Sequence, residues 1–240
     1  MCNYRFCIRI NFILVIFILY SVFFDIILEF LYNQNIMRKI LFTYDNYIFD
    51  LYGTLVDILT DEDSDTFWQK IAKMLNCDFS EVKSDYKSLC KQKQNEIGAE
   101  GEFELLDVFD FIIKKYDSPL TKEELAYKFR KASIVKERLF PFVKYGLKKL
   151  RKHKKGVYLI SNAQSCFTLR ELEDLGLNKY FDGIVISSEF GVKKPSPQIF
   201  EKALEQFGIE KSTCLYIGND PIDDIQGAES FGIQAHFVSR

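Results

Sequence analysis

The chain has 240 residues, of which 48% are hydrophobic, and its 32 basic and 34 acidic residues give a formal net charge of -2. This length and apolar content suit one large domain or a core that carries an inserted module. The balanced charge leaves no basic surface of the kind that binds nucleic acid, so no nucleic-acid partner is predicted. Six cysteines without a Cys-x-x-Cys pair predict reduced thiols and a cytoplasmic protein.

The first 36 residues differ in character from the rest of the chain. An apolar run from Phe12 to Phe24 follows Arg5 and Arg9, which resembles the start of a signal anchor. The run is shorter than the roughly 20 apolar residues that a spanning helix needs. Two interpretations stay open: residues 10–31 form a membrane anchor, or residues 1–36 are an upstream extension. We favour the second, with the functional chain starting at Met37.

The first strand and its turn are predicted over residues 45–56. The apolar residues Tyr47, Ile48 and Phe49 end abruptly in Asp50, and a turn at Gly53 follows. A buried strand that carries a carboxylate to the carboxyl edge of a parallel sheet, where ligands collect, has this pattern. A solvated aspartate at a strand end fits it equally well when the stretch is taken alone.

Residues 60–140 show almost no strand pattern and predict a block of about four helices. Thr121 and Glu124 form a capping box at the start of one of them. The last of these helices is expected to continue through Ile134 and Leu139, because apolar residues recur there at helical spacing.

Beyond Pro141 strands and helices alternate, which predicts a parallel sheet with right-handed crossovers. The expected helices are 143–153, 165–175, 197–207 and 223–231, and the expected strands are 156–160, 183–187, 213–217 and 235–238.

Polar residues follow the strands of this half. Ser161 and Asn162 follow one strand, Asn219 and Asp220 follow another with Asp224 shortly after, and Lys194 precedes Pro195 in a loop between them. Each group alone is also explained as a helix cap, a charge at a helix start or a solvated turn. Because all of these groups, like Asp50, are expected at the carboxyl ends of parallel strands, they favour one site at that edge of the sheet.

Phosphoryl transfer is the chemistry that fits these residue types together. Asp50 is expected to attack phosphorus and form an aspartyl phosphate, and Ser161 and backbone N–H groups are expected to hold phosphate oxygens. Lys194 is expected to neutralise charge and to keep Asp50 ionised. Mg²⁺ prefers few carboxylates together with carbonyl, water and phosphate oxygens. We expect its ligands from Asp50, the Tyr52 carbonyl and the acidic loop, where Asn219 or Asp220 binds and Asp224 orients.

The four motifs resemble those of the haloacid dehalogenase superfamily, in the order of that family and over residues 44–240. They are Asp50-Leu-Tyr-Gly-Thr-Leu, Ser161-Asn, Lys194-Pro-Ser-Pro and Gly218-Asn-Asp with Asp224. The resemblance implies an α/β fold, a Rossmann-like parallel-sheet core over 37–57 and 141–240 with a helical-bundle cap over 58–140. It also implies Mg²⁺-dependent phosphatase activity on a small phosphorylated molecule, with Gly53, Thr54 and Asn162 close to the substrate.

Two positions depart from the family pattern and keep alternatives open. Tyr52 stands where family phosphatases usually carry a second aspartate as general acid and base, and Asn219 replaces the usual metal-site aspartate. The Asp-x-Tyr-Gly-Thr form is similar to the family's 2-haloacid dehalogenases, which need no metal. Against that reaction, no arginine lies between Arg38 and Arg130 to bind a haloacid carboxylate. A catalytically weak protein used for binding or regulation is the third alternative. The loop 95–102 is expected to select the substrate.

Overall fold

The computed structural model of the chain describes residues 43–239 and contains a five-stranded parallel sheet. Its strand order is β5-β4-β1-β6-β7. The strands are β1 Asn46–Phe49, β4 Gly156–Ser161, β5 Gly183–Ile186, β6 Cys214–Gly218 and β7 Gln234–Phe237. The predicted α/β fold with a Rossmann-like parallel sheet is therefore confirmed, and β1, the first strand in the chain, lies at the centre of that sheet.

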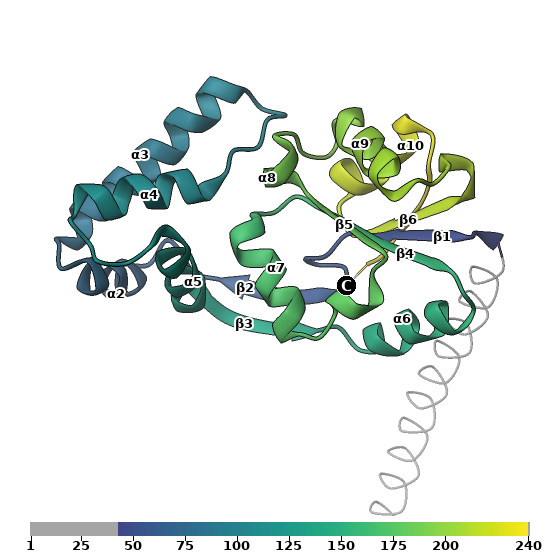
Figure 1. The fold of residues 1–240 in the computed structure, drawn as a ribbon, viewed down its shortest axis with the longest axis horizontal. Helices are drawn as coiled ribbons and strands as arrows, with labels where there is room; N and C mark the ends of the chain where they lie inside the picture. Colours follow the sequence, from purple (N-terminus) through teal and green to yellow (C-terminus); the bar gives the residue numbers. More distant parts are fainter. Residues whose placement is uncertain (1–42, 240) are drawn as a thin grey trace, which may run out of the picture. The chain divides into compact units, whose positions relative to one another are not determined.

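Helices cover both faces of the sheet (Figure 1). On one side lie α9 (Pro197–Phe207) and α10 (Gly227–Phe231), and on the other lie α6 (Val143–Lys152) and α7 (Ser165–Asp174). Ile48 of β1 and Tyr216 of β6 share a buried cluster with Ile199 and Phe200 of α9. The central strands are thus apolar because they are covered on both faces, as expected for a parallel sheet.

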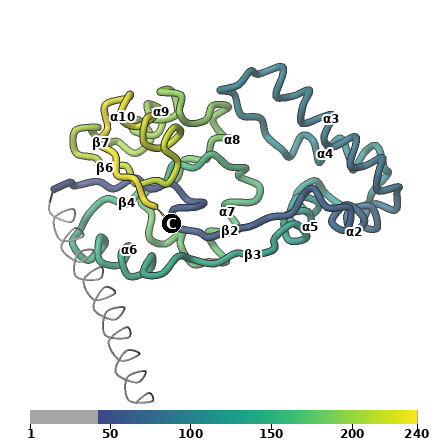
Figure 2. Tube along the Cα trace, turned by 180° about the vertical axis from the view of Figure 1, so that it is seen from behind, coloured from purple at the N-terminus to yellow at the C-terminus, as the bar shows by residue number. Residues whose placement is uncertain are grey.

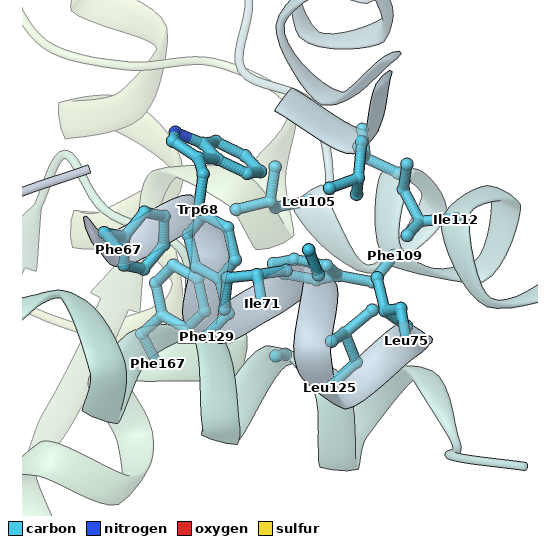
Figure 3. Close-up of a cluster of buried hydrophobic side chains, with 14 residues drawn as sticks. Phe67, Trp68, Ile71, Leu75, Leu105, Phe109, Ile112, Leu125, Phe129 and Phe167 are labelled. Atoms are coloured by element: carbon cyan, nitrogen blue, oxygen red, sulfur yellow. The ribbon is translucent and has the colours of Figure 1, made fainter. Parts of the chain in front are cut away.

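The helical block consists of α2 (Asp65–Leu75), α3 (Phe79–Ile97), α4 (Leu105–Lys115) and α5 (Lys122–Ser133). Its core is an aromatic cluster in which Phe67, Trp68, Phe109 and Phe129 pack edge to face, together with Phe167 of α7 (Figure 3). The block therefore shares its core with a helix of the sheet domain. The predicted capping box of Thr121 and Glu124 at the start of α5 is confirmed.

The expected helix through Ile134 and Leu139 is wrong. Residues Ile134–Leu139 form strand β3, which pairs antiparallel with β2 (Val56–Thr60), as the tube in Figure 2 shows. Asp57 of β2 lies 2.7 Å from Lys136 and 3.0 Å from Arg138 across the ribbon. These contacts join residues that are far apart in the chain. Pairing with the distant strand β2 therefore overrides the helical spacing of the apolar residues in 134–139. The two strands carry the chain to and from the helices.

Two smaller differences concern the elements that border the site. The helix expected from Asp223 begins earlier, as a π-helical segment η3 (Pro221–Gln226) that continues into α10. The strand expected to reach Ser187 ends at Ile186, and a short helix α8 (Ser187–Phe190) follows. Both changes occur where the chain leaves the carboxyl edge of the sheet.

Several predictions about the chain's organisation are tested only in part. The anchor or extension predicted for residues 1–36 lies outside the described residues. Within residues 43–239, no helix is long and apolar enough to cross a membrane. The cysteines of that range are free thiols, but only Cys214 is buried, whereas Cys77, Cys90 and Cys166 are half-buried.

Candidate functional site

The carboxyl ends of β1 and β4 bring two of the predicted site residues to one edge of the sheet. Asp50 directly follows β1, and its backbone N–H donates to the carbonyl of Ile217 at 2.9 Å. Ser161 is the last residue of β4, the parallel neighbour of β1. The sheet itself therefore fixes the position of the carboxylate relative to the hydroxyl.

Lys194 is the central group of the site and is only 2% exposed. Its Nζ lies within hydrogen-bond distance of four acceptors: Asp224 Oδ1 at 2.6 Å, Asp50 Oδ1 at 2.8 Å, Tyr216 Oη at 2.9 Å and the Ile160 carbonyl at 3.2 Å. An ammonium group has three protons. The four acceptors therefore compete for the donors of one buried cation.

Burial and the neighbouring charges shift the pKa values of Lys194 and Asp50. Burial lowers the pKa of Lys194, but Asp50, Tyr216 and Asp224 outweigh it and hold that pKa well above its ordinary value. Burial raises the pKa of Asp50, and the Lys194 ammonium opposes that effect. Lys194 thus stays charged, and it is the group that favours ionised Asp50, as expected. Burial is nevertheless the larger effect, so the pKa of Asp50 lies above its ordinary value.

Asp224 fixes the backbone of the acidic loop at Asn219 and Asp220. Its Oδ2 accepts the backbone N–H groups of Asn219 at 3.0 Å and Asp220 at 2.9 Å, while its Oδ1 faces Lys194. The carboxylate approaches the backbone so closely that a Cβ on Gly218 would lie 2.3 Å from Asp224 Oδ2. Asp224 is 1% exposed, so both of its oxygens are occupied by internal donors.

The two candidate metal residues of this loop occupy different environments. Asn219 lies against the turn after β1, where its Oδ1 accepts from Thr54 Oγ1 at 2.9 Å. Gly53 has φ +83°, and a Cβ there would lie 2.5 Å from the Asn219 amide nitrogen. Asp220 is exposed instead, and its Oδ1 caps η3 by accepting the N–H groups of Ile222 and Asp223. Of the two, Asn219 is the residue that contacts the turn after Asp50.

Asn162, which follows Ser161, hydrogen-bonds to the backbone of Lys194. Its Oδ1 accepts the backbone N–H of Lys194 at 2.8 Å, and its Nδ2 donates to the Lys194 carbonyl at 2.9 Å and to Asp223 at 3.1 Å. The neighbouring Ser161 is 1% exposed, and its Oγ has no hydrogen-bond partner among the described residues. A buried hydroxyl without a partner is costly, so Ser161 Oγ gains a missing hydrogen bond from an incoming acceptor.

Tyr52 does not join the cluster around Lys194. Its phenol donates to Glu171 Oε2 and lies 3.0 Å from Thr168 Oγ1, both on α7. Arg130 of α5 donates from Nε to Glu171 Oε1 at 2.6 Å, and its guanidinium carbon lies 5.7 Å from the Tyr52 ring centre. The sequence reasoning missed this group. The one available signal was an acidic residue, Glu171, one turn after Thr168 on the apolar face of a predicted helix.

A loop of the helical block reaches the edge of the sheet. Gln164 Nε2 donates to Glu102 Oε1 at 2.9 Å and to the Phe103 carbonyl at 3.0 Å, and the Glu102 N–H donates to the Gly191 carbonyl at 3.2 Å. Ser187 Oγ lies 3.3 Å from Glu102 Oε2. Glu102, at the end of the loop expected to select the substrate, is therefore held next to the segments that carry Asn162 and Lys194.

The cation ligands expected in this site are side-chain and carbonyl oxygens. Between residues 43 and 239, no group of three or more His, Cys, Asp and Glu side chains is arranged to hold a metal ion. Mg²⁺ is often bound by one or two carboxylates with other oxygens and water completing its shell. Of the expected ligand set, Asp50 directly precedes the turn after β1, and Asn219 contacts that turn through Thr54.

Comparison with known proteins identifies the family. The family model for haloacid dehalogenase-like hydrolases matches residues 44–232. A phosphoserine phosphatase of Thermus thermophilus is 30% identical over 102 residues, which cover 42% of this chain and 41% of that protein. The pyrimidine 5'-nucleotidase YjjG of Escherichia coli is 42% identical over 76 residues, 31% of this chain and 34% of that protein. The chain thus spans less than half the length of these two relatives.

A solved structure extends the match over the fold. The haloacid dehalogenase family enzyme of Bacteroides thetaiotaomicron superposes with a TM-score of 0.58 at 20% identity and covers 82% of this chain and 94% of its own. At that identity the similarity concerns the fold. With the family model matching most of the described residues, the chain belongs to the haloacid dehalogenase-like hydrolases.

Proposed function

We propose that the chain is a phosphatase that cleaves a small phosphomonoester through an aspartyl-phosphate intermediate on Asp50. The observation that carries this proposal is the buried ion pair of Asp50 and Lys194, 2.8 Å apart, at the sheet edge where Ser161 Oγ has no hydrogen-bond partner among residues 43–239. A nucleophile, a cation and a free donor at one sheet edge are the groups that a tetrahedral anion needs. The names of the curated relatives, among them a phosphoserine phosphatase, support the reaction class.

The residues have distinct roles in this reaction. Asp50 attacks phosphorus with a carboxylate oxygen, and Ser161 Oγ donates to a phosphate oxygen, which resolves its missing hydrogen bond. Lys194 shares its ammonium between Asp50 and the incoming anion. Asn162 holds the backbone of Lys194 from both sides. Gly53 and Thr54 shape the turn that contacts Asn219, close to the bound phosphate.

The donor set fits Mg²⁺. Asp50 and Asp224 share one ammonium, so the cluster is net negative, and a phosphate dianion entering it needs a further positive charge. Asp50, the Tyr52 carbonyl and Asn219 are the proposed ligands, with the free oxygen of Asp220 as the alternative to Asn219. Asp224 orients the loop, because both of its oxygens already accept internal donors. When bound, the ion neutralises charge on the transferring phosphoryl group.

The wider organisation follows from the same proposal. Residues 58–140 act as a cap that closes over a core formed by the described parts of 37–57 and 141–240, which are 43–57 and 141–239, and Glu102 is held at the sheet edge by Gln164. The substrate is a small phosphorylated molecule, and the protein is cytoplasmic. Membrane attachment through residues 10–31 remains the alternative location.

The test is phosphate release from a panel of sugar and nucleotide phosphates, with and without Mg²⁺. Asp50→Asn removes the nucleophile at nearly constant shape, and we expect it to abolish Mg²⁺-dependent phosphate release. Asp45→Asn is the matched control, since Asp45 is exposed and lies at the opposite end of β1, where it pairs with Lys155. This control is expected to retain activity.

Two outcomes would replace the proposal. Chloride release from 2-chloropropionate without metal, lost in Asp50→Asn, would identify a 2-haloacid dehalogenase-like enzyme. Turnover of neither substrate class by folded protein, with Asp50→Asn indistinguishable from wild type, would identify a catalytically weak binding or regulatory protein.

A further inference from the structure

Tyr52 stands two residues after Asp50, where the phosphatases that this chain resembles usually carry an aspartate as general acid and base. A group at this position would give a proton to the departing oxygen and later take one from water. The following inference rests on the proposed phosphatase function and concerns which leaving groups the site accepts.

The Tyr52 phenol is committed to contacts away from Lys194. Its proton is donated to Glu171, and Thr168 Oγ1 lies 3.0 Å from the same oxygen. Glu171 is 3% exposed and is held in turn by Arg130 at 2.6 Å. The phenol therefore directs its proton to Glu171 on α7.

The other groups near Asp50 are held by internal contacts. Lys194 Nζ is buried and donates to Asp50 and Asp224. Asp224 accepts hydrogen bonds at both oxygens, and the Tyr216 phenol donates to Asp224. Asp223 accepts from Asn162 at 3.1 Å, and it is the remaining carboxyl to test as a proton source.

We propose that this site takes acyl and aryl phosphates, whose leaving oxygen departs as a stable anion, in preference to alkyl phosphates. Asp50 forms a bond to phosphorus as the bond from phosphorus to the bridging oxygen breaks. The carboxylate or phenolate leaves with the electron pair and without a proton from the protein. Water then cleaves the aspartyl phosphate, which restores the Asp50 carboxylate and releases phosphate, with the surplus proton passing to solvent.

The expected size of the preference follows from the missing acid. A positioned general acid contributes about 10²- to 10⁴-fold to such a step. Alkyl phosphates, whose alkoxide is a poor leaving group, lose this factor, whereas acyl and aryl phosphates do not depend on it. Hydrolysis of the intermediate also lacks its base, so the aspartyl phosphate accumulates and the first turnover is faster than the following ones.

The experiment compares phenyl phosphate with benzyl phosphate on the full chain in Mg²⁺ buffer. Both carry one aromatic ring, but the first releases a phenolate and the second requires an alkoxide. We expect kcat/KM to be at least about 100-fold higher for phenyl phosphate, with 4-nitrophenyl phosphate giving a burst of one phenolate per active site. Acetyl phosphate is expected to group with the aryl esters.

Two substitutions of Tyr52 separate proton donation from packing. Tyr52→Phe and Tyr52→Asp both lose the hydrogen bond to Glu171, but only the aspartate can serve as an acid. We expect Tyr52→Phe to keep the ratio of phenyl to benzyl turnover, and Tyr52→Asp to lower it by raising benzyl phosphate turnover.

Equal kcat/KM for phenyl and benzyl phosphate in the wild type would overturn the inference. So would a larger phenyl-to-benzyl ratio in Asp223→Asn or Glu171→Gln, because that would reveal a working acid. Failure of the proposed function looks different: no ester or anhydride releases phosphate, and Asp50→Asn equals wild type.

Discussion

Replacing Lys194 by methionine tests the electrostatics of the site, since methionine keeps most of the side-chain volume and removes the charge. The substitution leaves Asp50 and Asp224, 7% and 1% exposed, without their shared cation. Breaking a buried pair in this way costs about 3–5 kcal/mol of unfolding free energy. That is a large part of the 5–15 kcal/mol that typically stabilises a domain.

The loss depends on pH with a defined sign. Burial raises the folded-state pKa of Asp50 and Lys194 opposes that effect, so the pKa of Asp50 is expected to rise further without Lys194. A carboxyl group of raised pKa stabilises the folded state at acidic pH, and this contribution disappears as pH rises through the raised pKa. We therefore expect Lys194→Met to be close to wild-type stability near pH 5 and strongly destabilised near pH 8.

Urea unfolding followed by circular dichroism at both pH values measures this difference. Lys193→Met is the matched control, because it removes the neighbouring, half-buried lysine and leaves the Asp50 and Asp224 contacts in place. A Lys194→Met protein as stable as this control near pH 8 would refute the buried charge cluster. A variant that folds only at acidic pH would support it.

Three further predictions concern the turn, the nucleophile and the helical core. Gly53→Ala is expected to reduce activity and to lower the unfolding free energy by about 1–3 kcal/mol. Gly208→Ala is expected to cost less, because both glycines have positive φ but only at Gly53 would a Cβ meet another group within 4 Å. Thermal unfolding and phosphate release measure the difference. Because burial raises the pKa of Asp50, and the ionised form attacks, the acid limb of the kcat/KM profile is expected above the ordinary value of 3.8; a limb below 3.8 contradicts the shift. Phe129→Ala is expected to cost about 3–5 kcal/mol in chemical unfolding and Phe111→Ala, 48% exposed, under about 0.5 kcal/mol; equal losses would contradict the assigned core.

The sequence predicted the parts of this protein that depend on local pattern. The run that ends in Asp50, the alternation of strands and helices beyond Pro141, and the capping box at Thr121 each follow from side chains close together in the chain. A parallel sheet with right-handed crossovers has only one edge where its strands end, so the meeting of Asp50 and Lys194 was predictable from order and spacing.

Only the tertiary structure decided the pairings between distant residues. Residues 134–139 have an apolar spacing compatible with a helix, yet they form a strand because β2 offers backbone partners and Asp57 offers a counter-charge to Arg138. The direction of the Tyr52 phenol depends on Glu171, which lies 119 positions away. No local rule links such residues, because their free energy of interaction exists only once the chain has folded around them.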